Sequence, residues 1–86
     1  MTTLTLYTRR DCHLCEEMKA VIREVGRTVP LTIEEVDIDR DRALVRRYGR
    51  DIPVLIAGGQ EIARHRVTAD RLREVLEAQT AGHHGE

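Results

Sequence analysis

Apolar and polar residues alternate along four stretches of the chain in ways that are typical of β-strands. In 4–7 and 31–38, apolar residues are interleaved with threonine or acidic residues, as in strands with one buried face. The stretch 52–57 is almost wholly apolar, whereas 60–67 is more polar, and we expect the latter at an edge of the sheet. Gly58 and Gly59 between these two stretches are a signal for a tight hairpin.

Three other stretches have apolar residues at the three-to-four-residue spacing of amphipathic helices. The first helix is predicted over about 14–25, with Asp11 as its N-cap and Gly26 at its end. A short second helix is predicted over 43–48. The third helix begins after Thr68, which is a typical N-cap residue.

The predicted order is therefore βαβ followed by ββα, with four strands and three helices. A βαβ unit places its two strands parallel and joined by a right-handed crossover, so the sheet is expected to be mixed. We predict one α/β domain over residues 1–80 and, because 81–86 has no apolar content, a disordered tail over 81–86. Tyr7, at the end of the first strand, is expected in the core.

Composition excludes several classes of function. A chain of 86 residues with 41% hydrophobic residues and a net charge of -1 is a small globular domain with no electrostatic preference for nucleic acid or anionic membranes. No apolar run has membrane-spanning length, and the N-terminus lacks a signal-type segment. We therefore expect a cytoplasmic, monomeric protein. In a reducing compartment, a close cysteine pair favours catalysis or metal binding over a permanent bridge.

Both cysteines lie at the predicted first strand-to-helix junction, in the sequence Cys12-His13-Leu14-Cys15. The start of a helix favours a thiolate, so Cys12 is the candidate nucleophile. Cys15, one turn inside the helix and less exposed, is the candidate resolving thiol. The alternative is half of a zinc site.

Two further residues stand between the cysteines. Protonated His13 would stabilise a thiolate on Cys12, or else His13 is an exposed turn residue of little effect. Leu14 either contacts a partner or belongs to the apolar stripe of the helix.

Three sequence features together resemble the glutaredoxin-like proteins of the thioredoxin superfamily. They are Leu6-Tyr7-Thr8 followed by the CxxC motif, Val36-Asp37-Ile38-Asp39 at the end of the second strand, and Ile52-Pro53-Val54 followed by the Gly58-Gly59 hairpin. The resemblance covers about residues 3–79. It implies a thioredoxin-like (glutaredoxin-type) fold with a four-stranded mixed sheet and three helices.

The resemblance also implies a function and a second group of site residues. The function is reduction of protein or small-molecule disulfides by a thiol-disulfide oxidoreductase, with no tightly bound cofactor and no metal. Pro53 would follow a cis peptide bond and face the CxxC motif, and Asp51 and Ile52 would flank a substrate groove. The backbone before the proline would then pair with an extended substrate chain.

One departure from the family pattern concerns the electron donor. Glutaredoxins that use glutathione carry a glycine pair and a nearby aspartate after the last strand, whereas the corresponding stretch of this chain, from Ala63 to Asp70, lacks the glycines. We therefore expect poor use of glutathione as the reductant, with a reductase as the other candidate. Two alternatives stay open for the whole chain. One is iron-sulfur or zinc binding through the CxxC motif in a dimer, and the other is a redox-inactive binding module.

Overall fold

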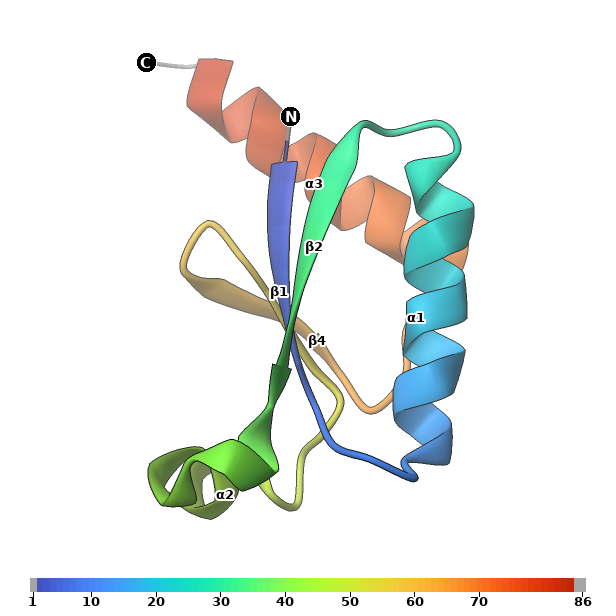
Figure 1. Cartoon of the computed structure of the whole chain (residues 1–86). Helices are drawn as coiled ribbons and strands as arrows, with labels where there is room; N and C mark the ends of the chain where they lie inside the picture. Colours follow the sequence, from blue (N-terminus) through green and yellow to red (C-terminus); the bar gives the residue numbers. More distant parts are fainter. Residues whose placement is uncertain (1, 85–86) are drawn as a thin grey trace.

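The computed structural model describes the backbone of residues 2–84 and the side chains of residues 2–79 (Figure 1). The strands are β1 (Thr2–Thr8), β2 (Leu31–Asp37), β3 (Val54–Ala57) and β4 (Gln60–Arg64). The helices are α1 (His13–Gly26), α2 (Arg42–Tyr48) and α3 (Ala69–His84), with a 3-10 turn η1 (Ile38–Arg40) before α2. The predicted order of elements is confirmed.

The four strands form one mixed sheet in the order β2-β1-β3-β4. β1 runs parallel to β2 from Thr2↔Leu31 to Thr8↔Asp37, and β3 is antiparallel to both β1 and β4. β4 lies at an edge, as predicted. The two-residue β3–β4 hairpin requires positive φ angles, and the two glycines supply them, with φ 58° at Gly58 and 79° at Gly59.

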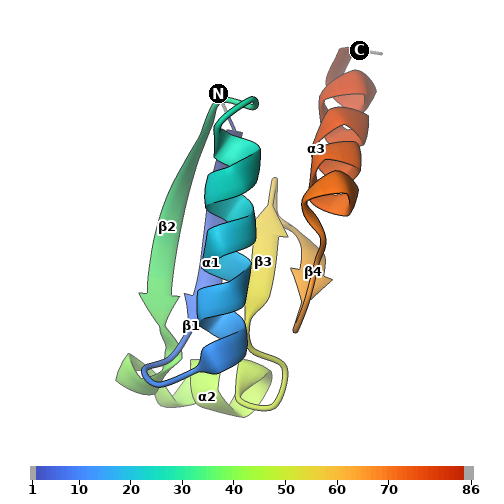
Figure 2. The same ribbon diagram turned by 90° about the vertical axis from the view of Figure 1, so that its right-hand side faces the viewer.

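The hydrophobic core lies between one face of the sheet and the helices α1 and α3 (Figure 2). Side chains of β1 and β3 that point to this face meet the apolar stripes of the two helices. The cluster consists of Leu4, Leu6, Met18, Ile22, Val25, Leu55, Ala57, Leu72 and Leu76. Burial of this one face is the main source of stability in so small a domain.

The opposite face of the sheet is covered differently. Helix α2 lies at one end of the sheet and has no buried residue (Figure 1). The expectation that Tyr7 is a core residue is wrong, because alternation along β1 turns its ring away from Leu4 and Leu6. The half-buried ring instead stacks on that of Tyr48, with ring centroids 4.5 Å apart.

Two predicted boundaries need correction. Asp11 is not the N-cap of α1: it has a positive φ of 57° in the preceding turn, and Cys12 caps the helix. Helix α3 continues to His84, so residues 81–84 of the predicted disordered tail are helical, and 85–86 lie outside the described residues. No proline interrupts the chain there, and Ala81 has high helix propensity. Among the described residues, no helix has the length and apolar character needed to cross a bilayer.

Candidate active site

Two segments that are far apart in the sequence leave the sheet at the same end. Tyr7 near the end of β1 pairs with Val54 at the start of β3. The last residue of β1 with the residues that follow it, and the residues that precede β3, therefore emerge side by side. We call them the cysteine segment (residues 8–12) and the proline segment (residues 50–53). The predicted site residues thus come from one end of the molecule.

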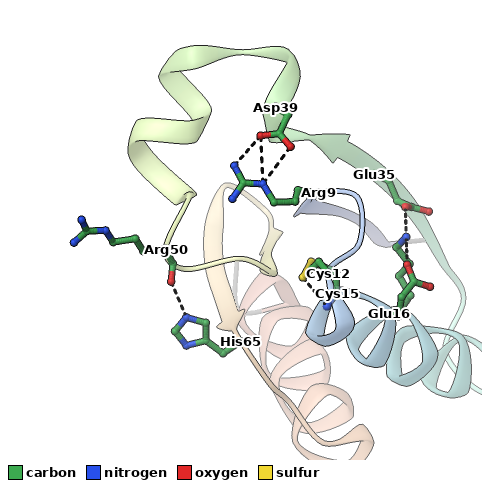
Figure 3. Close-up of a disulfide and its surroundings, with 9 residues drawn as sticks. Arg9, Cys12, Cys15, Glu16, Glu35, Asp39, Arg50 and His65 are labelled. Carbon is green, nitrogen blue, oxygen red and sulfur yellow. Dashed lines mark hydrogen bonds and ion pairs between the residues drawn. A yellow bond between two sulfur atoms is a disulfide. The ribbon is translucent and has the colours of Figure 1, made fainter.

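Cys12 and Cys15 form a disulfide at the N-terminus of α1, with Cα atoms 5.2 Å apart (Figure 3). Cys12 has an extended backbone, and its Sγ accepts a hydrogen bond of 3.1 Å from the backbone N–H of Cys15. That N–H is one of the free donors of the first helical turn. Cys12 is half-buried and Cys15 is fully buried. An outside thiol or disulfide therefore reaches Cys12 more readily than Cys15.

The two residues between the cysteines differ in exposure. The side chain of His13 is 88% exposed, and its Nε2 lies 2.9 Å from Oε2 of Glu17, one turn along α1. The other oxygen of Glu17 lies 3.8 Å from Nη1 of Arg66. Leu14 is half-buried. The effect of His13 on the Cys12 thiolate and the contact of Leu14 with a partner stay predictions.

The proline segment has the backbone that the sequence predicts. The peptide bond Ile52–Pro53 is cis, and Pro53 is buried. The N–H groups of Asp51 and Ile52 both donate to the carbonyl of Tyr48, at 2.8 and 3.1 Å. The N–H of Ile52 is therefore already engaged at the end of α2, and an incoming chain would have to displace that bond in order to use it.

His65 contacts the proline segment, which the sequence does not indicate. It follows β4 with a positive φ of 64°. Its N–H donates to the carbonyl of Pro53 at 2.8 Å, and its ring Nε2 lies 3.2 Å from the carbonyl oxygen of Arg50 (Figure 3). No local pattern predicts a contact between residues 15 positions apart. The absence of the family's glycine pair from this stretch of the chain is a signal that could have drawn attention to it.

Charged pairs hold the cysteine segment and the first turns of α1 (Figure 3). The guanidinium of Arg9 binds Asp39 with distances of 2.7, 3.2 and 3.3 Å. The hydrogen bond from Arg9 lowers the pKa of Asp39, and the same bond raises the pKa of Arg9. These residues tie the segment in front of Cys12 to η1.

A second charged group lies on α1 just after the disulfide. Lys19 is held between Glu35 of β2 and Glu16 of α1, with distances of 2.9 and 3.0 Å. Hydrogen bonds to Glu35 first, and then to Glu16, raise the pKa of Lys19. Lys19 therefore joins α1 to the edge strand β2.

Thr8, the last residue of β1, has a buried side-chain hydroxyl. The residue is 6% exposed, and its Oγ1 is buried without a hydrogen-bond partner among the described residues. A buried hydroxyl without a partner carries a cost in stability. The cysteine segment thus begins with a buried hydroxyl that lowers the stability of the fold.

A groove of about 600 Å³ lies between α1 on one side and β4 with the segment that leads into α3 on the other. Its floor is apolar, formed by Met18, Val21, Ile62, Ala63 and Val67, and Glu17 and Arg66 lie on its rim. Because Glu17 also contacts His13, the groove begins close to the CxxC motif. In the described part of the chain, no group of three or more His, Cys, Asp or Glu side chains is arranged as metal ligands would be.

Comparison with known proteins identifies relatives over nearly the whole chain. The family model described as "Glutaredoxin-like domain (DUF836)" matches residues 3–77. The X-ray structure of protein XcR50 from X. campestris is 39% identical, with a TM-score of 0.74, and the match covers 87% of this chain and 96% of that one. The solution structure of protein Ne2328 from Nitrosomonas europaea is 32% identical, with a TM-score of 0.76 and coverages of 86% and 89%.

More distant structures resemble the chain in fold. Desulfothioredoxin from Desulfovibrio vulgaris Hildenborough, solved in its reduced form, is 18% identical, with a TM-score of 0.68. That match covers 90% of this chain and 80% of desulfothioredoxin. The predicted thioredoxin-like α/β fold is confirmed.

Proposed function

We propose that this protein, which belongs to the family of glutaredoxin-like domains (DUF836), is a thiol-disulfide oxidoreductase that reduces disulfides of proteins or small molecules. The observation that carries the proposal is the unequal access to the two cysteines. Cys12 is half-buried at the helix N-terminus, and Cys15 is fully buried behind it. Exchange through a mixed disulfide needs one accessible attacking thiol and one protected resolving thiol.

The reaction starts from the dithiol form of the protein. The Cys12 thiolate attacks one sulfur of the substrate disulfide, and the other substrate sulfur leaves as a thiolate that takes up a proton. The Cys15 thiolate then attacks Sγ of Cys12. This step forms the Cys12–Cys15 disulfide and releases the second substrate thiol. Two electrons and two protons from an external dithiol or two monothiols restore the reduced protein.

The local structure supports the same division of roles. The N–H of Cys15 already donates to Sγ of Cys12, and a negative sulfur would strengthen this bond. The partial positive charge of the helix N-terminus acts in the same direction. This effect is strongest at the first turn of a helix, and Cys12 is the N-cap of the 14-residue helix α1.

Replacing each cysteine by serine tests the proposal. Cys12→Ser should abolish disulfide reduction, because the attacking sulfur is lost. Cys15→Ser should still attack, but it should accumulate a mixed disulfide between Cys12 and the substrate, which intact-mass spectrometry detects. Equal activity of Cys12→Ser and the unaltered protein, or no adduct on Cys15→Ser, would contradict the assigned roles.

The electron donor is tested with the oxidised protein alone. We propose that a thioredoxin-reductase-type enzyme restores the dithiol faster than glutathione does, because residues 63–70 lack the glycine pair that glutathione users carry in the corresponding stretch. The rate of dithiol formation with each donor system is measured by thiol titration. Faster reduction by glutathione would overturn this part of the proposal and leave the exchange chemistry intact.

A further inference from the structure

The end of β4 holds the proline segment at three points. Nη1 of Arg64 lies 3.3 Å from Oδ1 of Asp51. The N–H of His65 donates to the carbonyl of Pro53 at 2.8 Å, and the His65 ring lies 3.2 Å from the carbonyl oxygen of Arg50. We call these three contacts the clasp. Two consecutive residues at the edge of the sheet, Arg64 and His65, therefore hold three of the four residues of the proline segment.

The backbone of His65 has a conformation that is energetically unfavourable for a residue with a side chain. A φ of 64° is free of steric penalty for glycine but not for other residues. Such conformations persist in proteins where the surrounding structure imposes them, and they gather at functional sites. Here the ring gains a hydrogen bond that glycine could not make. Donation to the Arg50 carbonyl requires the proton to be on Nε2.

We infer that His65 is a positioning residue that fixes the proline segment beside the disulfide, and that it thereby favours extended peptide disulfides over small ones. The inference rests on the proposed function. If an extended substrate chain lies against the proline segment, as the resemblance to the family implies, its binding depends on where that segment lies. A small disulfide needs little more than access to the sulfur, and its reduction is insensitive to the clasp.

The test compares two substrates and two variants. His65→Gly removes the ring and also the φ penalty, so the melting temperature should change little. KM for a peptide with an intramolecular disulfide should rise about fivefold, the effect of one hydrogen bond. The kcat for this peptide, and both constants for hydroxyethyl disulfide, should stay unchanged. His65→Gln restores an N–H donor and should lower the peptide KM again, which a purely structural role of the ring would not require.

A measurement that needs no activity accompanies the kinetics. Amide hydrogen exchange at Asp51 and Ile52, whose N–H groups bond to Tyr48, should be faster in His65→Gly and slower again in His65→Gln. Arg64→Gln removes the ion pair with Asp51 and also the pair with Glu61, and it should likewise make amide exchange at Asp51 and Ile52 faster. If His65→Gly does not fold, His65→Asn takes its place, because asparagine also tolerates a positive φ and has a shorter side chain.

The outcomes separate the two levels of the argument. If the unaltered protein reduces neither substrate, the proposed function is wrong. The amide exchange rates then test only whether the clasp holds the proline segment. The inference is overturned if the unaltered protein is active and His65→Gly leaves the KM for each substrate and the amide exchange rates at their unaltered values. Equal increases of KM for both substrates would overturn the preference for extended chains.

Discussion

The two segments that meet at the disulfide are held in opposite ways. The proline segment is fixed by the buried ring of Pro53, by hydrogen bonds that its N–H groups donate to the carbonyl of Tyr48, and by hydrogen bonds that its carbonyls accept from His65. The cysteine segment is fixed largely by the exposed ion pair of Arg9 with Asp39, and it begins with the unpaired hydroxyl of Thr8. The proline segment is anchored mainly by packing and neutral hydrogen bonds, to which the ion pair of Arg64 with Asp51 is added, whereas the cysteine segment is anchored mainly by charge at the surface.

This difference fits the tasks proposed for the two segments. The cysteine segment must adjust as the disulfide opens and closes, and an exposed ion pair can be broken and remade at little cost. The proline segment makes and breaks no covalent bond, so it can serve as a fixed surface against which a substrate lies. Three substitutions test whether the two segments are held as differently as the contacts indicate.

The largest effect is expected in the proline segment. Pro53→Ala removes buried ring atoms and leaves a cavity, which should lower the free energy of unfolding by about 2 kcal/mol. Pro30→Ala is the matched control, because Pro30 is the other proline of the chain and is exposed. Its effect should be well below that of Pro53→Ala in denaturant titrations of both variants. Equal losses in the free energy of unfolding would show that the burial of Pro53 does not stabilise the protein more than the exposed Pro30 does.

An intermediate effect of opposite sign is expected at the start of the cysteine segment. Thr8→Val replaces the unpaired hydroxyl by a methyl group of similar size, and it should raise the free energy of unfolding by about 1 kcal/mol. Thr3→Val, at an exposed position of the same strand, should change it little. Destabilisation by Thr8→Val would mean that the hydroxyl has a partner in solution.

The smallest effect is expected from the ion pair. Arg9→Gln should lower the melting temperature by about 2 °C at low salt, and less at 1 M NaCl, where screening is strong. Arg10→Gln is the matched control, because Arg10 is exposed and has no ion-pair partner among the described residues. A loss that is independent of salt would show that Arg9 acts through packing of its stem.

The same pair gives a dependence on pH. Arg9 lowers the pKa of Asp39 in the folded state relative to the unfolded chain. The stabilisation is therefore present above the unfolded pKa of an aspartate and is lost as the pH falls through the lower, folded value. The difference in melting temperature between Arg9→Gln and the unaltered protein should shrink in acid. A difference that stays constant down to acid pH would contradict this assignment.

Much of the fold could be predicted because its signals are local. Alternation along 31–38, the glycine pair of the hairpin and the apolar spacing of α1 each depend on neighbouring residues, and the structure confirms all three. The cysteine pair at the start of α1 was predictable for the same reason. The cis bond before Pro53 was also predicted, although only through the resemblance to a family.

The misses are one local boundary, at the start of α1, and contacts between distant parts of the chain. Asp11 has the chemistry of a cap, but the turn into α1 places Cys12 at the cap position. Tyr7 is apolar enough for the core, yet its partner Tyr48 lies on α2. His65 belongs to the stretch 60–67, for which a polar edge strand was predicted, and it is exposed. Its contact with Arg50 depends on how β4 ends against the proline segment, which no local pattern encodes.

The stacked tyrosines have a practical consequence for experiments. Tyr7 and Tyr48 are the only aromatic residues in the chain, which has no tryptophan and no phenylalanine. Near-ultraviolet absorption and intrinsic fluorescence therefore arise almost entirely from this single pair, apart from the weak absorption of the disulfide. Such signals report whether α2 is docked against β1, and they are blind to the core under α1 and α3. A melting curve recorded from these tyrosine signals would follow the contact between α2 and β1, whereas calorimetry or far-ultraviolet circular dichroism would follow the whole domain.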